Sequence, residues 1–295
     1  MVASAIRSTI VRAFQVLERV APEAGARWGA RLWFTPPPPI PLDRLAQAPP
    51  GEETGVELDG RTLRATAWGS GPLVLLVHGW GGRSEQLAAL VGPLTASGHR
   101  VVALDAPGHG RSGPGALGGR RSTVPEFAAA LHAAATQDGG RVHAVVAHSL
   151  GATAAVLAVR EGLRPRRLVL LAPMGDPSRV FASFAAHLGT GPRVRSRLER
   201  RVLRTVGLPW AAFDPSAAPR SGTVPPTLVV HDRHDREVPF EEGRRVAEAW
   251  PDARLIATDG LGHRRLLRDP GVVDAVARFV AASGAASPET GRWSA

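Results

Sequence analysis

At the centre of the chain the sequence reads Val145-Val146-Ala147-His148-Ser149-Leu150-Gly151-Ala152. The apolar residues before His148 indicate a buried strand, and the small residues after Leu150 indicate the start of a helix. A strand, a serine at the corner and a helix make the layout of a nucleophile elbow, G-x-S-x-G, with Ala147 in place of the first glycine. We therefore expect Ser149 to be a nucleophile. The alternative is an ordinary strand-to-helix turn with an incidental serine.

Composition excludes several kinds of chemistry. The 295 residues contain no cysteine, which rules out disulfides, a thiolate nucleophile and cysteine-based metal sites. All 36 basic residues are arginine, so there is no lysine for a Schiff base or for a Walker-type phosphate loop. Lysine, asparagine and tyrosine are absent while alanine, glycine, proline and arginine abound, which indicates a GC-rich, bacterial genome.

The net charge of +10 does not by itself indicate a nucleic-acid partner. The arginines are spread along the whole chain with few aromatic residues beside them, so we expect no nucleic-acid binding. No segment approaches the roughly 20 apolar residues of a membrane span. Charged residues at positions 7, 12 and 18 interrupt the N-terminal apolar pattern, which therefore lacks the core of a secretory signal. We expect the protein to be cytoplasmic.

Strand and helix patterns alternate along most of the chain. A hairpin is expected at residues 56–58 and 61–68 around the turn Asp59-Gly60. Six further strands are expected at 73–77, 100–104, 142–147, 167–171, 227–230 and 254–257, with helices at 84–96, 123–136, 150–161, 241–250 and 271–282. This pattern predicts an α/β fold: a mostly parallel eight-stranded sheet with helices on both faces. Such sheets bind ligands at the carboxyl ends of their strands.

Three segments lie outside that core, which we expect to comprise residues 51–172 and 227–282. Residues 1–50 predict an amphipathic helix (2–20) and a proline-rich connection. The helix is expected to pack on the main domain, with contact to a membrane surface as the alternative. Residues 173–226 contain no strand pattern but two helical ones, near 178–188 and 193–206, so we expect a helical lid inserted after the sixth strand. The tail 283–295 is expected to be disordered.

A serine nucleophile needs a base and a group that orients the base. His263 lies in a glycine-rich loop just after the last strand, and the strand at 227–230 is followed by two candidate acids, Asp232 and Asp235. Both loops belong to the edge of the sheet that carries Ser149. The nucleophile, acid and base would then follow the order Ser…Asp…His along the chain.

Acyl transfer also needs donors for an oxyanion. The Leu150 N–H lies at a helix N-terminus and is free to serve as one donor. A second glycine-rich turn, His78-Gly79-Trp80-Gly81-Gly82, follows the strand at 73–77. Its glycines let the backbone approach a substrate oxygen, so we expect the Trp80 N–H to be the second donor.

Residues 56 to 282 strongly resemble the α/β-hydrolase family. The resemblance rests on LVHGWGG (76–82), ALDAPGHGRS (103–112), AHSLG (147–151), DRHDREVP (232–239) and GLGH (260–263). It implies Ser149 as nucleophile, His263 as base, and the N–H groups of Trp80 and Leu150 as oxyanion donors. In this family the acid usually lies four residues before the proline of such a segment, which implies Asp235 rather than Asp232. Asp105 and His109 are implied to hold the neighbouring loop, and Ala147 departs from the usual glycine.

These expectations together predict a serine hydrolase that cleaves a carboxylic ester or thioester through an acyl-enzyme, with no cofactor and no metal. The same residues would also serve lactone hydrolysis, acyl transfer, perhydrolysis or carbon–carbon cleavage. A non-catalytic scaffold that binds a small ligand or a partner is the alternative of another class. A metal site at His231 and His234 lacks an apparent third ligand. The six arginines between Arg193 and Arg204 indicate a solvated basic face, with guidance of an anionic thioester as the alternative.

Overall fold

The computed structural model describes residues 2–45, 47–217 and 224–282, and within them the chain forms one eight-stranded sheet. The strands are β1 (Glu52–Leu58), β2 (Arg61–Trp68), β3 (Leu73–Val77), β4 (Arg100–Leu104), β5 (Val142–His148), β6 (Arg167–Leu171), β7 (Thr227–Asp232) and β8 (Ala253–Thr258). Their spatial order is β1-β2-β4-β3-β5-β6-β7-β8. β2 pairs antiparallel with β1 and β4, and all other pairs are parallel. The predicted fold class is confirmed.

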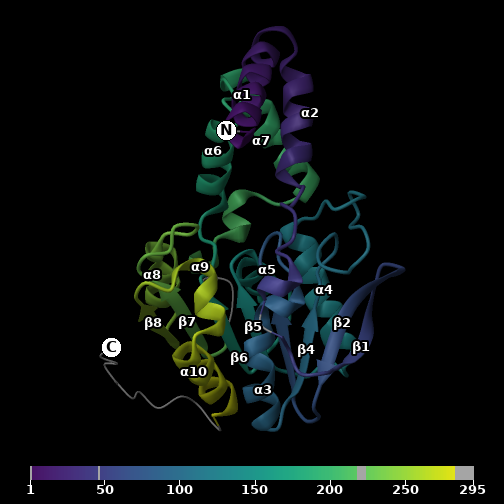
Figure 1. Ribbon diagram of the computed structural model, residues 1–295, viewed down its shortest axis with the longest axis vertical. Coiled ribbons are helices and arrows are strands. Elements are labelled where there is room, and N and C mark those ends of the chain that lie inside the picture. The colour runs from purple at the N-terminus through teal and green to yellow at the C-terminus, as the bar shows by residue number, and fades with distance from the viewer. Residues whose placement is uncertain (1, 46, 218–223, 283–295) are drawn as a thin grey trace.

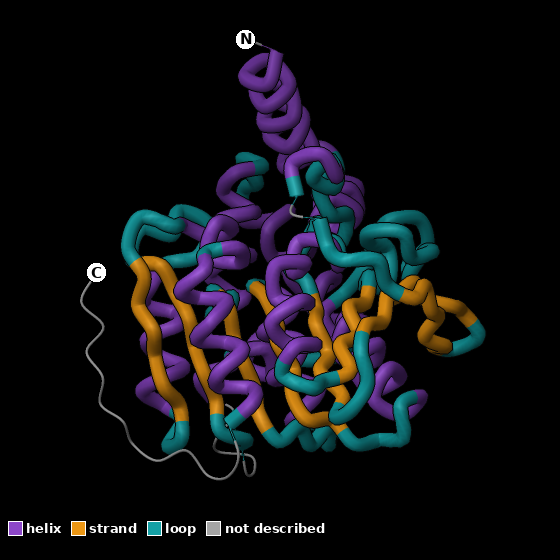
Figure 2. The backbone as a smooth tube through the Cα atoms, turned by 60° about the horizontal axis from the view of Figure 1, so that its bottom comes forward, coloured by secondary structure: helices purple, strands orange, loops and turns teal. Residues whose placement is uncertain are grey.

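Helices cover both faces of the sheet (Figure 2). The α-helices are α1 (Val2–Val20), α2 (Pro22–Trp33), α3 (Ala88–Ala96), α4 (Val124–Gln137), α5 (Leu150–Arg160), α6 (Pro177–His187), α7 (Pro192–Val206), α8 (Phe240–Ala249), α9 (Gly262–Arg265) and α10 (Pro270–Ala281). Short 3-10 helices lie at Leu42–Arg44, Ser84–Leu87, Trp210–Phe213 and Leu266–Arg268. Among the helices of the described residues, none has the length and apolar character needed to cross a membrane.

A strand such as β3 is an unbroken apolar run because both of its faces are buried. In β3, Leu75 packs into a core shared with α4, α5 and α8, whereas its neighbour Leu76 packs into a second core with α3 and α10. Successive side chains of a strand point to opposite faces, so an unbroken run such as Leu73–Val77 fills both cores. The sheet is thereby fixed between two helical layers, and its strand ends become rigid positions for the loops that follow them.

Four helices form a bundle above the sheet, which we call the cap: α1, α2, α6 and α7 (Figure 1). The helices expected near 178–188 and 193–206 are present as α6 and α7. The principal contacts of α1 are with α2 and α7 rather than with the sheet. The carboxylate of Glu18 in α1 accepts hydrogen bonds from the N–H groups of Arg193 and Val194, at 2.8 and 2.9 Å. It thereby satisfies two donors that the first turn of α7 would leave without partners.

Two elements differ from the sequence-based expectation. The helix α2 occupies a segment that was expected to belong to a proline-rich connection. Its small residues Gly25, Ala26, Gly29 and Ala30 form the buried face, and such a face carries little of the apolar signal on which helix prediction depends. The strand β1 begins at Glu52, four residues before the expected start at residue 56. Its first residues are polar and exposed at the sheet edge, so they lack the apolar signal from which a strand is predicted. The expected disordered tail and residues 218–223 of the expected lid lie outside the described residues.

We predict that Gly25→Leu destabilises the cap. A Cβ atom at Gly25 would lie 2.9 Å from a methyl group of Val194 in α7 and 3.3 Å from the Cβ of Leu17 in α1. A leucine would therefore force the three helices apart, at a cost of about 1–3 kcal/mol for overpacking. Thermal unfolding should show a Tm several degrees lower than that of Arg27→Leu, which places the same side chain on the exposed face of α2. Equal Tm values for the two variants would contradict the prediction.

Candidate active site

Ser149 occupies a strained corner between β5 and α5. Its φ and ψ are 55° and −120°, a region that residues with a side chain rarely adopt. The surrounding backbone holds this conformation: the Ser149 N–H donates to the carbonyl of Leu171 at 2.9 Å, and the Ser149 carbonyl accepts from the N–H of Ala152 at 3.0 Å. Strain of this kind persists only where neighbouring structure enforces it. The backbone at this corner therefore holds the Ser149 side chain in a fixed position.

The turn after β3 lies in direct contact with this corner. A Cβ atom at Gly151 would lie 2.3 Å from the carbonyl oxygen of His78, and one at Gly79 would lie 2.9 Å from the Cβ of Ser149. Neither space admits a methyl group, so both positions require glycine. Ala147, the departure from the usual elbow pattern, lies two residues before Ser149 in β5, where its methyl group is fully buried in the sheet core.

Two backbone N–H groups belong to the turns that meet at Ser149. The Leu150 N–H is the first of α5, and the Trp80 N–H belongs to the turn that touches Ser149. Among the described residues, neither N–H group makes a hydrogen bond. The ring of His78 fixes this turn, since its Nε2 accepts from the Ala106 N–H at 3.1 Å and its Nδ1–H donates to the Gly79 carbonyl at 2.7 Å. Burial lowers the pKa of His78 to about 4, so the ring stays neutral.

His263 and Asp235 are joined by a short hydrogen bond. The Nδ1–H of His263 donates to Oδ2 of Asp235 at 2.7 Å, and Nε2 has no hydrogen-bond partner within the described part of the chain. Both side chains are almost completely buried. In the described part of the chain, the Ser149 hydroxyl makes no hydrogen bond to His263; such bonds are often long before a substrate binds. A carboxylate on Nδ1 favours the tautomer whose Nε2 accepts a proton.

The carboxylate of Asp235 has four polar partners. Its Oδ1 accepts from the N–H groups of Glu237 and Val238 at 2.8 and 2.9 Å, and Oδ2 also lies 3.3 Å from Nε2 of the buried His231. Burial alone would raise the pKa of Asp235, but the hydrogen bonds from His231, His263 and Val238 lower it below its usual range. Asp235 is therefore a carboxylate. This contact of His231 was not expected, although the place of His231 at the end of β7, four residues before Asp235, was a signal for it.

Asp232 makes a different set of contacts. Its Oδ2 accepts from the Thr258 hydroxyl and from the Leu261 N–H, both at 2.8 Å, while Oδ1 accepts from the His234 N–H at 2.9 Å. These bonds outweigh the burial that would raise the pKa of Asp232, and lower it. Asp232 thus ties the end of β7 to the loop that leads from β8 to His263.

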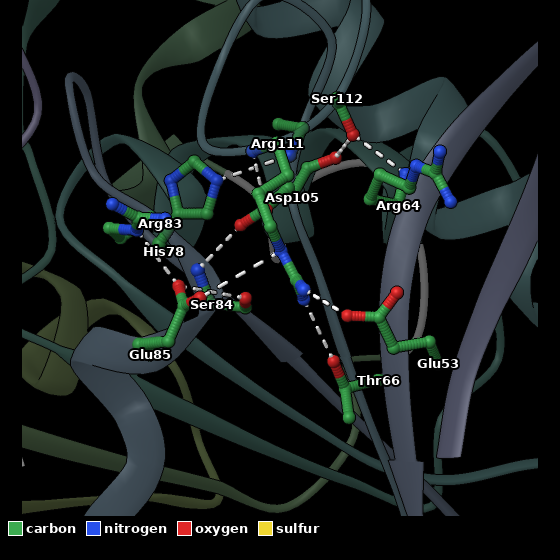
Figure 3. A network of polar contacts seen from close by, with 11 residues as sticks. Glu53, Arg64, Thr66, His78, Arg83, Ser84, Glu85, Asp105, Arg111 and Ser112 are labelled. Atoms are coloured by element: carbon green, nitrogen blue, oxygen red, sulfur yellow. Dashed lines mark hydrogen bonds and ion pairs between the residues drawn. The ribbon is translucent and has the colours of Figure 1, made fainter. Parts of the chain in front are cut away.

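Asp105 and His109 lie in the loop after β4. Oδ1 of Asp105 accepts from the Ser84 N–H at 2.7 Å and Oδ2 accepts from the Arg111 N–H at 2.8 Å, so the carboxylate joins two loops (Figure 3). Burial raises the pKa of Asp105. The His109 ring packs against the rings of Trp80 and His78, with centroids 5.0 and 5.3 Å apart. Burial lowers the pKa of His109 to about 3, and repulsion between the two rings in their charged forms, His109 and His78, is the next largest cause.

His148, the residue before the serine, contacts both the backbone and the ring of His263. Its Nε2–H donates to the backbone carbonyl of His263 at 3.0 Å, and the two rings lie 4.7 Å apart between centroids. Burial, followed by repulsion from His263, lowers the pKa of His148 to about 3, so this ring is neutral as well. The β5 strand thereby positions both the serine and, through His148, the backbone of His263.

A cavity of about 530 Å³ lies over Ser149. Ser149, His263, Trp80 and Leu150 all line it, whereas Asp235 lies behind His263 and outside the lining. Residues from the N-terminal segment 32–40 form another part of the wall. This position was not expected, because nothing in a proline run indicates its distant neighbours. Of the predicted basic segment 193–204, no arginine lines the cavity, and α7 contributes only Val206.

The metal alternative finds no support in the described residues. His231 contacts Asp235 and the Val238 carbonyl, while His234 pairs with Asp259 at 2.7 Å on the surface. Within residues 2–45, 47–217 and 224–282, no group of three or more histidine, aspartate or glutamate side chains is arranged to hold a metal ion.

Two protein-family models match the chain. Residues 71–207 match a model described as serine aminopeptidase, S33, and residues 206–290 match one described as TAP-like protein. The dihydrolipoyllysine-residue acetyltransferase component of the acetoin cleaving system of Cupriavidus necator is 36% identical over 130 residues. That match covers 43% of this chain but only 34% of the relative, so the chain corresponds to about a third of that protein.

Two further relatives match over a greater length. A 2-hydroxy-6-oxononadienedioate/2-hydroxy-6-oxononatrienedioate hydrolase of Cupriavidus pinatubonensis is 29% identical over 234 residues, covering 64% of this chain and 80% of the relative. The solved structure of an esterase from Exiguobacterium antarcticum shares the fold, with a TM-score of 0.58 and 16% identity, and covers 79% of this chain and all of that one. Because the two family models together run from residue 71 to residue 290 and the fold agrees with them, the chain belongs to the α/β-hydrolase family of enzymes.

Proposed function

We propose that this protein is a serine hydrolase that cleaves a carboxylic ester or thioester through an acyl-enzyme on Ser149. The observation that carries the proposal is the 2.7 Å bond between His263 Nδ1 and Asp235, beside a cavity that also contains Ser149. A base held in the correct tautomer next to a strained serine is what nucleophilic acyl transfer needs. No cofactor and no metal enters the reaction as we propose it.

In the first half of the reaction, Nε2 of His263 takes the proton of the Ser149 hydroxyl while Oγ attacks the carbonyl carbon. The resulting oxyanion accepts hydrogen bonds from the N–H groups of Trp80 and Leu150, which have no other hydrogen-bond partner among the described residues. The intermediate then collapses, and His263 returns the proton to the departing alcohol or thiol. Asp235, held as a carboxylate, stabilises the imidazolium that forms between these two transfers.

In the second half, a water molecule replaces the alcohol. His263 takes a proton from this water, whose oxygen attacks the acyl carbon, and the second oxyanion occupies the same pair of donors. Collapse breaks the bond to Ser149, returns the proton to its Oγ and releases a carboxylic acid. The neutral rings of His78, His109 and His148 support the surrounding turns and take no part in the proton transfers.

Carbon–carbon bond hydrolysis is the second candidate, because a relative named for a 2-hydroxy-6-oxo-dienedioate substrate matches 64% of the chain. The lining of the cavity does not favour it. A dienedioate carries two carboxylates, and Arg264 is the single arginine among the lining residues that the structure describes. Its guanidinium already pairs with Glu237 at 3.0 Å. Ester or thioester hydrolysis therefore remains the preferred proposal.

Ser149→Ala should abolish both labelling by a fluorophosphonate probe and ester turnover. Removal of a nucleophile costs on the order of 10⁴-fold or more in rate, and the fold should remain, since alanine at this position makes the same backbone hydrogen bonds. Mass spectrometry of the labelled protein and initial rates with p-nitrophenyl esters measure the two effects. Ser183→Ala, on the exposed face of α6, is the matched control and should keep both. Labelling that survives in Ser149→Ala would exclude Ser149 as the nucleophile, and absence of labelling in the parent protein would favour a non-catalytic scaffold.

Asp235→Asn and Asp232→Asn should separate orientation of the base from support of its loop. An asparagine at 235 favours the wrong tautomer of His263, and kcat should fall by about 10³–10⁴-fold. An asparagine at 232 weakens the bonds to Thr258 and Leu261, so Tm should fall while kcat changes far less. Steady-state kinetics together with thermal unfolding of both variants measure this. The opposite ranking of kcat, in variants of equal Tm, would assign the acid to Asp232.

A further inference from the structure

The N-terminal segment 32–40 is attached directly to the loops of the site. Pro37 lies close to Gly81, the residue after Trp80. A Cβ atom at Gly81 would come within 2.6 Å of the ring of Pro37. The carbonyl of Pro37 accepts from Arg120 at 3.1 Å, and the carbonyl of Phe34 accepts from the Ser122 N–H at 3.0 Å. The segment is thus held against the turn that carries the Trp80 N–H.

Aromatic rings form the roof of the cavity on this side. The ring of Trp33 meets those of Phe184 and Trp210 edge to face, with centroids 5.1 and 6.1 Å apart, and all three residues line the cavity. The polar end of the Trp210 indole donates to Glu199 of α7 at 2.8 Å. This bond satisfies the Trp210 N–H outside the cavity, so Trp210, like the phenyl ring of Phe184, presents apolar surface to a bound molecule.

The charges of the lining lie on the opposite side, next to His263. Glu237 and Arg264 pair with each other there, and both are about half exposed. A leaving group must lie within reach of His263, which protonates it. The alcohol or thiol part of a substrate therefore belongs beside this solvated ion pair, and the acyl part extends past Trp80 toward the aromatic roof and segment 32–40.

We propose that segment 32–40 and the aromatic roof form an acyl-binding wall, and that the enzyme prefers uncharged esters whose acyl group is bulky, flat and apolar. The inference rests on the proposed function of Ser149 and His263. An anionic acyl group would enter a wall with no cation to receive it, because the arginines of α7 are absent from the lining that the structure describes. The volume of about 530 Å³ lies in the range of small-molecule sites and accommodates a phenyl-bearing acyl group.

A series of p-nitrophenyl esters tests the preference on the parent protein. With the leaving group constant, kcat/KM should be at least about tenfold higher for phenylacetate than for acetate, since a buried aromatic acyl group gains apolar contact in the transition state. The hemisuccinate should be at least about tenfold poorer than the butyrate, which has a similar length but no charge, because its carboxylate would lose water without gaining a partner.

Trp33→Ala tests the wall itself. It should lower the ratio of kcat/KM for phenylacetate to that for acetate by at least about tenfold, since a large aromatic contact is removed. Trp28→Ala is the matched control: it removes the same side chain from the same helix, where it stacks on Phe14 within the cap and lies outside the cavity lining. Its ratio should equal that of the parent. Val206→Trp, which fills the cavity instead of enlarging it, should also lower the ratio and serves if Trp33→Ala does not fold.

The outcomes separate this inference from the function on which it rests. Labelled Ser149 with equal or better turnover of acetate or hemisuccinate would overturn the acyl preference and leave the hydrolase assignment intact. If the ratio of kcat/KM for phenylacetate to that for acetate is unchanged in both Trp33→Ala and Val206→Trp, segment 32–40 and the aromatic roof do not bind the acyl group. No labelling and no turnover of any ester would instead refute the proposed function, and this inference with it.

Discussion

Contact between two backbone turns governs the arrangement of the site. The corner at Ser149 and the turn that begins at His78 approach until the carbonyl of His78 occupies the space where Gly151 would carry a side chain. Parallel pairing of β3 with β5 brings the two turns to the same edge of the sheet. The contact brings together, at Ser149, the two turns that carry the N–H groups of Trp80 and Leu150. Any residue larger than glycine at 79 or 151 would force these two turns apart.

The two aspartates after β7 show how the end of one strand supports two tasks. Asp232, still within the strand, bonds to Thr258 and Leu261 and so sets the course of the loop that reaches His263. Asp235, three residues later, meets the ring of His263 itself. His231 lies behind both, buried within contact of Asp235. One carboxylate thus places the backbone of the loop, and the other fixes the orientation of the ring that the loop carries.

Local sequence pattern was sufficient for the sheet and for the loops that carry the candidate residues. Apolar runs such as Leu73–Val77 mark strands buried on both faces, and glycines mark the close turns after them. The catalytic roles of Ser149, Asp235 and His263 remain predictions, although the structure brings Ser149 and His263 to one cavity. Pattern was insufficient for α2 and for segment 32–40. Their positions depend on contacts with Val194, Phe184 and Gly81, which lie far away in the chain and leave no local periodic signal.

The interlocking of α1 with α7 has a consequence for the order in which the protein is assembled. Glu18 and the N–H group it binds at Arg193 are separated by 175 residues. During synthesis α1 and α2 emerge before the sheet, yet α7, against which they pack, emerges only after six of the eight described strands. The face of α2 that packs against α7 therefore stays uncovered until α7 has been synthesised. Contacts of such long sequence separation slow folding and prolong the exposure of apolar surface, so we expect completion of the cap to be a late step in folding.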